Sequence, residues 1–166
     1  MESVPAATAA TEESVRSYLG VDYRRHYAAL LRQHPAPPDA IAELCLFRFW
    51  LACRAHLHAH GAETARLSPR RLPADWPLPR QVAGFDIAYR LGAWFEHLLE
   101  SRLDLYDRFF LHGRQADDPL GLDAAALALT CQLFVQPPAP LRAALQAEAR
   151  TLFARLAAAG RAVPGA

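Results

Sequence analysis

The clearest pattern of hydrophobic and polar positions lies between Pro79 and Gly113. Apolar side chains recur there in steps of three and four residues, the spacing of one face of an α-helix, and polar side chains follow the opposite stripe. The apolar positions are Gly84, Ile87, Ala88, Leu91, Phe95, Leu98, Leu99, Tyr106, Phe109 and Phe110. The pattern predicts one long central amphipathic helix over residues 79–112, around which the rest of the chain packs.

The 13 prolines divide the rest of the chain, because proline ends helices and is excluded from their interiors. Periodic apolar patterns between the prolines predict further helices over residues 11–34, 39–60, 122–135 and 140–159. The first has a candidate hinge at Gly20, and Gly61 ends the second. Residues that favour strands are scarce, and no run alternates between polar and apolar positions.

These elements predict an all-α protein, a single-domain helical bundle of about five helices over residues 11–160. Residues 1–10 and 161–166 are expected to form flexible tails. The helix over 39–60 is apolar almost all round, which places it in the middle of the bundle. Glu43, Arg48 and Arg54 interrupt its apolar run, so we expect no membrane span.

Composition limits the classes of function. The chain has 166 residues, of which 52% are hydrophobic and 21% charged, as is typical of one globular domain. Its net charge of +1 gives no electrostatic reason to expect nucleic acid. All 18 basic residues are arginine, which reflects either the codon bias of a GC-rich, bacterial-like genome or selection for arginine at interfaces.

The three cysteines, Cys45, Cys53 and Cys131, each sit inside an apolar helical pattern. Buried thiols in a reducing compartment fit this arrangement best. The first residues show neither a basic region nor an apolar core of the kind found in signal peptides. We therefore expect a cytoplasmic protein.

A candidate metal site lies at the end of the second predicted helix. Cys53, His56 and His60 are spaced i, i+3 and i+7, which places them on one helix face, and thiolate and imidazole are good zinc ligands. The alternative is a half-buried helix end, with Cys53 in the core and the histidines in water. No CxxC pair and no HExxH motif accompanies the set.

A second candidate is the polar stripe of the predicted central helix, which carries His97, Glu100, Asp104 and Asp107. Carboxylates beside a histidine could bind a divalent cation or act as acid and base. A solvated helix face and an acidic docking strip for a basic partner are the alternatives.

Arg48 stands out because it interrupts an apolar helix between Phe47 and Phe49. An isolated buried guanidinium is very costly, so the position predicts a buried ion pair, with Asp86, Glu96 or Asp104 as partner. Otherwise the side chain reaches the surface along its aliphatic stem.

The irregular connection over residues 62–78 holds the last candidate. Trp76, with Arg70, Arg71 and Arg80 nearby, combines the residue types most enriched at binding hot spots. These residues form either a docking patch or, if Trp76 folds back, a lid on the bundle.

No catalytic motif such as GxSxG, a P-loop or GxGxxG occurs in the chain. The sequence therefore favours a non-enzymatic module that binds another protein, as a chaperone, adaptor or regulatory or assembly subunit, without a cofactor. The alternative is a small metal-binding protein or metalloenzyme that uses Cys53, His56 and His60. Whether the chain forms a homo-oligomer stays open.

Overall fold

The computed structural model describes residues 15–34, 37, 39–59, 61–62, 64–68, 76, 78–79, 92–115 and 121–161. After a helical turn at residues 15–19, its helices are α2 (Tyr23–His26), α3 (Ala28–Gln33), α4 (Ala40–Ala59), α5 (Gly92–Gln115), α6 (Leu122–Leu133) and α7 (Ala139–Arg161). These ranges contain no strand, and the predicted all-α helical bundle is confirmed.

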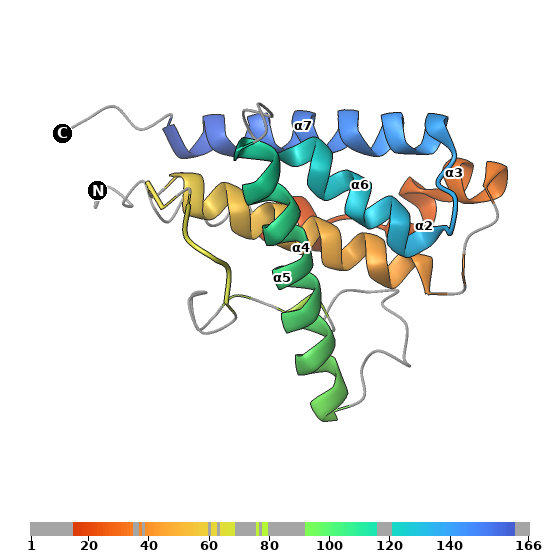
Figure 1. The fold of residues 1–166 in the computed structure, drawn as a ribbon, viewed down its shortest axis with the longest axis horizontal. Helices are drawn as coiled ribbons and strands as arrows, with labels where there is room; N and C mark the ends of the chain where they lie inside the picture. Colours follow the sequence, from red (N-terminus) through yellow and green to blue (C-terminus); the bar gives the residue numbers. More distant parts are fainter. Residues whose placement is uncertain are drawn as a thin grey trace.

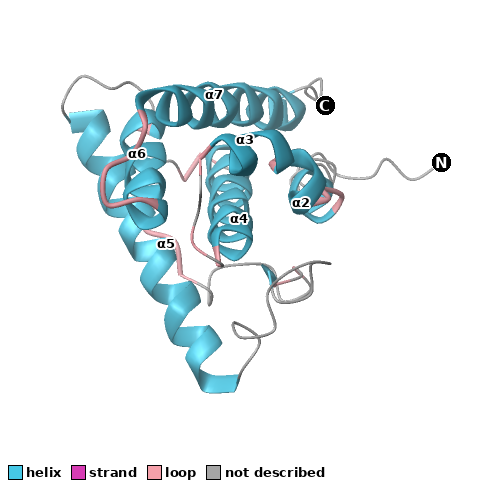
Figure 2. Ribbon diagram, turned by 90° about the vertical axis from the view of Figure 1, so that its right-hand side faces the viewer, coloured by secondary structure: helices cyan, strands magenta, loops and turns pink. Residues whose placement is uncertain are grey.

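Helix α4 occupies the middle of the bundle, as its apolar composition predicted. Figure 2 shows α5 and α6 on one side of α4, α2 on the other, α3 above α4 and α7 across the top. Every residue of α4 from Ala42 to Ala55 is buried. Figure 1 shows that α5 crosses the other long helices steeply and that its first turns extend beyond them.

The bounds of three predicted helices agree with α4, α6 and α7 to within two residues. Helix α5 covers the second part of the helix predicted over 79–112 and continues to Gln115, whereas residues 80–91 lie outside the described residues. In the described part of the chain, no helix combines the length and the apolar composition that crossing a membrane requires.

The helix predicted over residues 11–34 is not continuous: its described part is broken at the candidate hinge, Gly20, and again at Tyr27, where no break was predicted. Asp22 caps α2 by accepting a hydrogen bond from the backbone N–H of Arg25 at 3.1 Å, and Tyr27, at φ −97° and ψ 7°, separates α2 from α3. In one straight helix Tyr18 and Tyr23 would point about 140° apart. The breaks allow both side chains to be buried, at 0% and 1% exposure.

The close approach of α5 and α6 depends on Gly121. This residue has a φ of 67°, and a Cβ atom there would lie 1.8 Å from the backbone oxygen of Phe110. Gly61 also has a positive φ, 70°, and follows the end of α4, but a Cβ there would meet nothing within 4 Å. Of these two glycines, therefore, Gly121 is the one at which helix packing itself requires glycine.

Candidate functional site

A buried ion pair between Arg54 and Asp107 joins α4 to α5. Arg54 Nε and Nη2 lie 2.9 and 2.8 Å from Asp107 Oδ1, and both side chains are at most 2% exposed. The carboxylate also accepts from Trp50 Nε1 at 2.8 Å and from the backbone N–H of Leu67 at 2.6 Å. Arg54 Nη2 donates to the carbonyl of Ala65 at 2.7 Å. The pair therefore holds the segment around Ala65 and Leu67 against both helices.

The position of Asp107 corrects the predicted polar stripe on α5. His97 and Glu100 are exposed, and Asp104 is half-buried where it pairs with Arg108 at 2.7 Å. Asp107 instead faces the core, because donors from α4 and from the following loop compensate for the burial of its charge. No group of three His, Cys, Asp or Glu side chains among the described residues is arranged to hold a metal ion.

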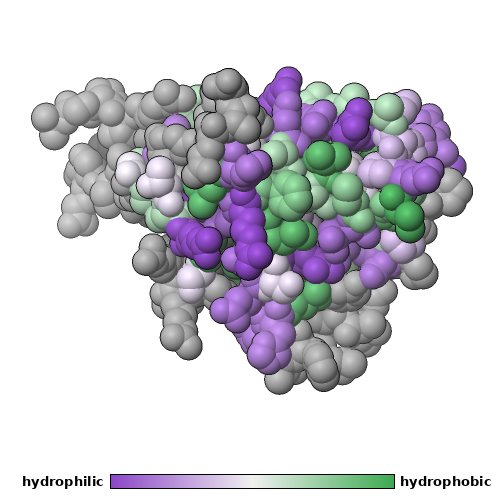
Figure 3. All heavy atoms as spheres, viewed as in Figure 1, coloured by the Kyte–Doolittle hydropathy of each residue, from purple (hydrophilic) through white to green (hydrophobic). Residues whose placement is uncertain are grey.

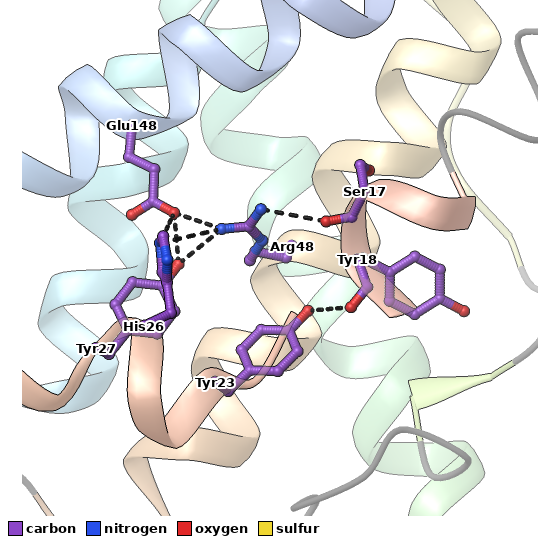
Figure 4. Close-up of polar contacts among 7 residues, drawn as sticks. All are labelled: Ser17, Tyr18, Tyr23, His26, Tyr27, Arg48 and Glu148. Carbon is purple, nitrogen blue, oxygen red and sulfur yellow. Dashed lines mark hydrogen bonds and ion pairs between the residues drawn. The ribbon is translucent and has the colours of Figure 1, made fainter. Parts of the chain in front are cut away.

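A second ion pair joins α4 to α7 and also holds the N-terminal segment (Figure 4). Arg48 Nη1 lies 2.5 Å from Glu148 Oε1, and the Arg48 side chain is 8% exposed. His26 Nε2 and the Tyr27 hydroxyl lie 3.0 and 2.8 Å from the same oxygen. Arg48 Nη2 donates to the carbonyl of Ser17 at 3.2 Å. The contacts of Arg48 and Glu148 thus connect three segments of the chain: the N-terminal segment, α4 and α7.

The partner of Arg48 is not one of the three expected from the sequence. Asp86 lies outside the described residues, Glu96 is exposed, and Asp104 pairs with arginines at the surface. The Arg48 side of α4 is covered by α7, so the carboxylate comes from the last helix of the chain.

A shallow groove of about 340 Å³ opens beside this cluster, lined in part by His26, Glu148, Thr151 and Arg155. One Glu148 oxygen takes all the Glu148 contacts drawn in Figure 4, and the other points away from Arg48. Burial and the charge of Glu148 raise the pKa of Tyr27, so its hydroxyl stays a neutral donor. The contacts of Ser17, His26 and Tyr27 with Arg48 and Glu148 hold the N-terminal segment to α4 and α7.

The structure gives no support to a metal site at Cys53, His56 and His60. Cys53 is 0% exposed, and burial together with the charge of Asp107 raises the pKa of its thiol well above the ordinary value. A cysteine binds a metal ion as the thiolate, which burial of Cys53 disfavours. His56 is half-buried with its ring 5.0 Å from that of Trp76, and His60 lies outside the described residues.

Trp76 is 5% exposed and packs its ring against His56. It therefore covers the bundle, as the alternative interpretation expected, and does not present an aromatic surface to a partner. Arg70, Arg71 and Arg80, the other members of the predicted docking patch, lie outside the described residues.

A surface with no counterpart among the predicted sites lies where α5 and α6 run side by side. Figure 3 shows hydrophobic side chains gathered over this place. Phe109 is 39% exposed and lines a hollow of about 450 Å³ with Arg108 and His112, and Val135 is fully exposed. We call this the α5–α6 surface. Its apolar residues are Leu105, Phe109, Ala124, Leu127, Cys131 and Val135.

The sequence does carry a signal for this surface, in a long run without charge. Residues 124–141 contain no Asp, Glu, Lys, Arg or His. Such a run predicts a buried helix, and α6 does bury Leu122, Ala125 and Leu129 among others. Its outward side nevertheless carries Leu127, half-buried, and Cys131, exposed.

Comparison of the chain with protein-family models, with curated proteins and with solved structures finds no match. The function is therefore inferred from the geometry of the described residues.

Proposed function

We propose that the chain is a non-enzymatic helical module that binds another protein, as a chaperone, adaptor or regulatory or assembly subunit, through the α5–α6 surface. The observation that supports this proposal is the exposed aromatic residue Phe109 at a hollow on α5, beside a helix α6 that leaves Leu127 and Cys131 accessible. Contiguous exposed apolar patches on folded proteins mark interaction sites more often than chance.

The surface has the features that protein interfaces need. Its side chains stand on helices held together by the turn at Gly121, so little order has to be created when a partner binds. Aromatic and aliphatic side chains at the centre of an interface supply most of its binding energy.

We place this activity in the cytoplasm. All three cysteines are free, which suits a reducing compartment. The net charge of +1 supports a protein partner over nucleic acid.

Site-specific crosslinking tests the proposal. A photoactivatable group is attached to Cys131, which is exposed on the α5–α6 surface, while Cys45 and Cys53 are buried. The matched control carries Cys131→Ser and Ala29→Cys, which moves the group to an exposed position on α3, away from this surface. We expect a discrete crosslinked partner from position 131 and none from position 29.

The crosslinked partner is then purified and its affinity measured. Val135→Asp and Cys131→Asp place a charge on exposed positions of the surface, whereas Ala29→Asp is the control on α3. The proposal requires that the first two variants weaken binding at least tenfold and that the control leaves it unchanged. Equal affinities for all three variants would refute it.

A further inference from the structure

We infer that the α5–α6 surface receives an amphipathic helix whose apolar stripe is flanked by acidic residues. This inference rests on the proposed function and concerns the chemistry of the partner. It follows from the charges that border the surface on its two long sides.

On the α5 side, the border is formed by Arg108 and His112, which line the hollow with Phe109. Arg108 pairs with Asp104, but its side chain is 67% exposed and that of Asp104 only 40%. The guanidinium is therefore the more exposed member of the pair and remains accessible to the carboxylates of a partner.

The α7 side repeats this arrangement. Arg150 binds the carboxylate of Asp123 at the start of α6, and the exposed fractions of the two side chains are 61% and 29%. Gln146, one turn earlier on α7, donates to the backbone carbonyl of Asp123 at 3.2 Å. Arg142 lies one further turn back along the same edge and is exposed.

Between these borders, the floor of the surface has no charge of its own, since residues 124–141 carry none. An apolar floor between two basic edges is complementary to a helix with apolar residues at spacings of three and four and with Asp or Glu beside them. The carboxylates of such a helix would meet Arg108 and His112 on one side and Arg142 and Arg150 on the other.

A second copy of this chain fits less well than an acidic partner. A two-fold symmetric contact places the same surface on both subunits. The borders that both copies would contribute carry three arginines, Arg108, Arg142 and Arg150, against two carboxylates, Asp104 and Asp123, so the contact would not be balanced in charge. Charge complementarity therefore favours a different chain.

Synthetic peptides test the inference on the full-length protein. Two peptides of about 14 residues, about four helical turns, carry the same apolar stripe, flanked by Glu in one and by Arg in the other. Binding is followed by fluorescence anisotropy of the peptide and, independently, by protection of the Cys131 thiol from a maleimide. The burial of Cys45, whose pKa is raised to about 12, and of Cys53 makes the fast reaction specific for Cys131.

We expect the Glu-flanked peptide to bind about tenfold more tightly than the Arg-flanked one and to protect Cys131. Its affinity should fall between 0.1 M and 1 M salt, as the Debye length shrinks from about 10 Å to about 3 Å. Arg142→Glu should reduce the preference for the Glu-flanked peptide, because it reverses one of the charges on the border. Arg32→Glu, an exposed charge reversal on α3, should not.

The remaining outcomes separate this inference from the proposed function. If the Arg-flanked peptide binds equally or better, protects Cys131 and is lost in Val135→Asp, the acidic partner is refuted while protein binding at this surface stands. If neither peptide protects Cys131 and the crosslinked partner is indifferent to Val135→Asp, both are refuted. A dimer in sedimentation equilibrium that Val135→Asp converts to monomer would identify a second copy as the occupant and overturn the inference.

Discussion

Replacing Asp107 by Asn should be among the most damaging small changes to this protein. The substitution keeps the size of the side chain but removes the charge that faces Arg54, which is 1% exposed. It also turns one carboxylate oxygen into an NH₂ group. Because Trp50 Nε1 donates to Oδ1 and the Leu67 N–H to Oδ2, either orientation of the amide sets a donor against a donor.

The magnitude follows from the burial of both partners. Removing one member of a buried ion pair costs about 3–5 kcal/mol, because the other charge is left unpaired in the core. Folded domains are stable by about 5–15 kcal/mol, so this loss is a large part of the total. Arg54→Met should cost a similar amount, since it leaves Asp107 without its cation.

Urea unfolding of the double-mutant cycle measures the coupling. With an m-value of about 2 kcal/mol per molar, Asp107→Asn should lower the midpoint by about 2 M. Once Asp107 is neutral, Arg54→Met should cost far less than it does alone, giving a coupling of about 2–3 kcal/mol. Losses below about 1 kcal/mol for the single variants, or losses that add in the double variant, would refute the reasoning.

Three further changes probe other parts of the structure. Gly121→Ala forces a Cβ against the backbone of α5 and should lower the free energy of unfolding in urea by more than about 3 kcal/mol. Gly61→Ala meets only the conformational penalty of a positive φ, about 1–2 kcal/mol. Equal losses in the two variants would contradict the role of Gly121 in packing. Burial raises the pKa of Cys45 to about 12, so the folded protein keeps a thiol proton that the unfolded chain releases above its ordinary pKa. The free energy of unfolding should therefore fall as pH rises above about 9, and it should fall less steeply in Cys45→Ala. Glu148→Gln should lower the free energy of unfolding by about 1–2 kcal/mol, because Arg48 is buried but the carboxylate is 29% exposed. Amide hydrogen exchange should accelerate in residues 15–33 before it does in α6. Unchanged exchange in residues 15–33 would refute the role of the pair.

Helix positions could be predicted well from the sequence wherever one element is bounded by proline or glycine. Helix α4 ends before Gly61 and α7 begins in a proline-rich turn, so both were placed closely. In the N-terminal segment, Gly20 indicated the first break, but the second break, at Tyr27, could not be predicted because the apolar spacing is helical throughout. The break there comes from the burial of tyrosines against α4, which is a tertiary effect.

The polar contacts were predictable only in part. The apolar surroundings of Arg48 indicate that it needs a counter-charge, but its partner, Glu148, lies 100 residues further along the chain. That choice depends on which helix covers which side of α4. Asp107 looked like a member of a solvated stripe, since periodicity alone cannot show that Trp50 and Arg54 would reach it.

The α5–α6 surface shows the converse limit. An uncharged run is equally compatible with a helix enclosed on all sides and with one that stands at the edge of a bundle. The difference lies in the number of neighbouring helices, which the pattern of a single segment does not contain.

The contact between Asp107 and Leu67 has a consequence for how this protein opens. Loop amides usually exchange with solvent through small local fluctuations, whereas core amides require larger openings. The N–H of Leu67 belongs to an irregular segment, but its acceptor is a carboxylate buried between α4 and α5. Releasing that amide means separating the loop from an ion pair in the core. Residues 64–68 therefore belong to the same cooperative unit as α4 and α5, and we expect proteolysis within them to require the bundle to loosen first.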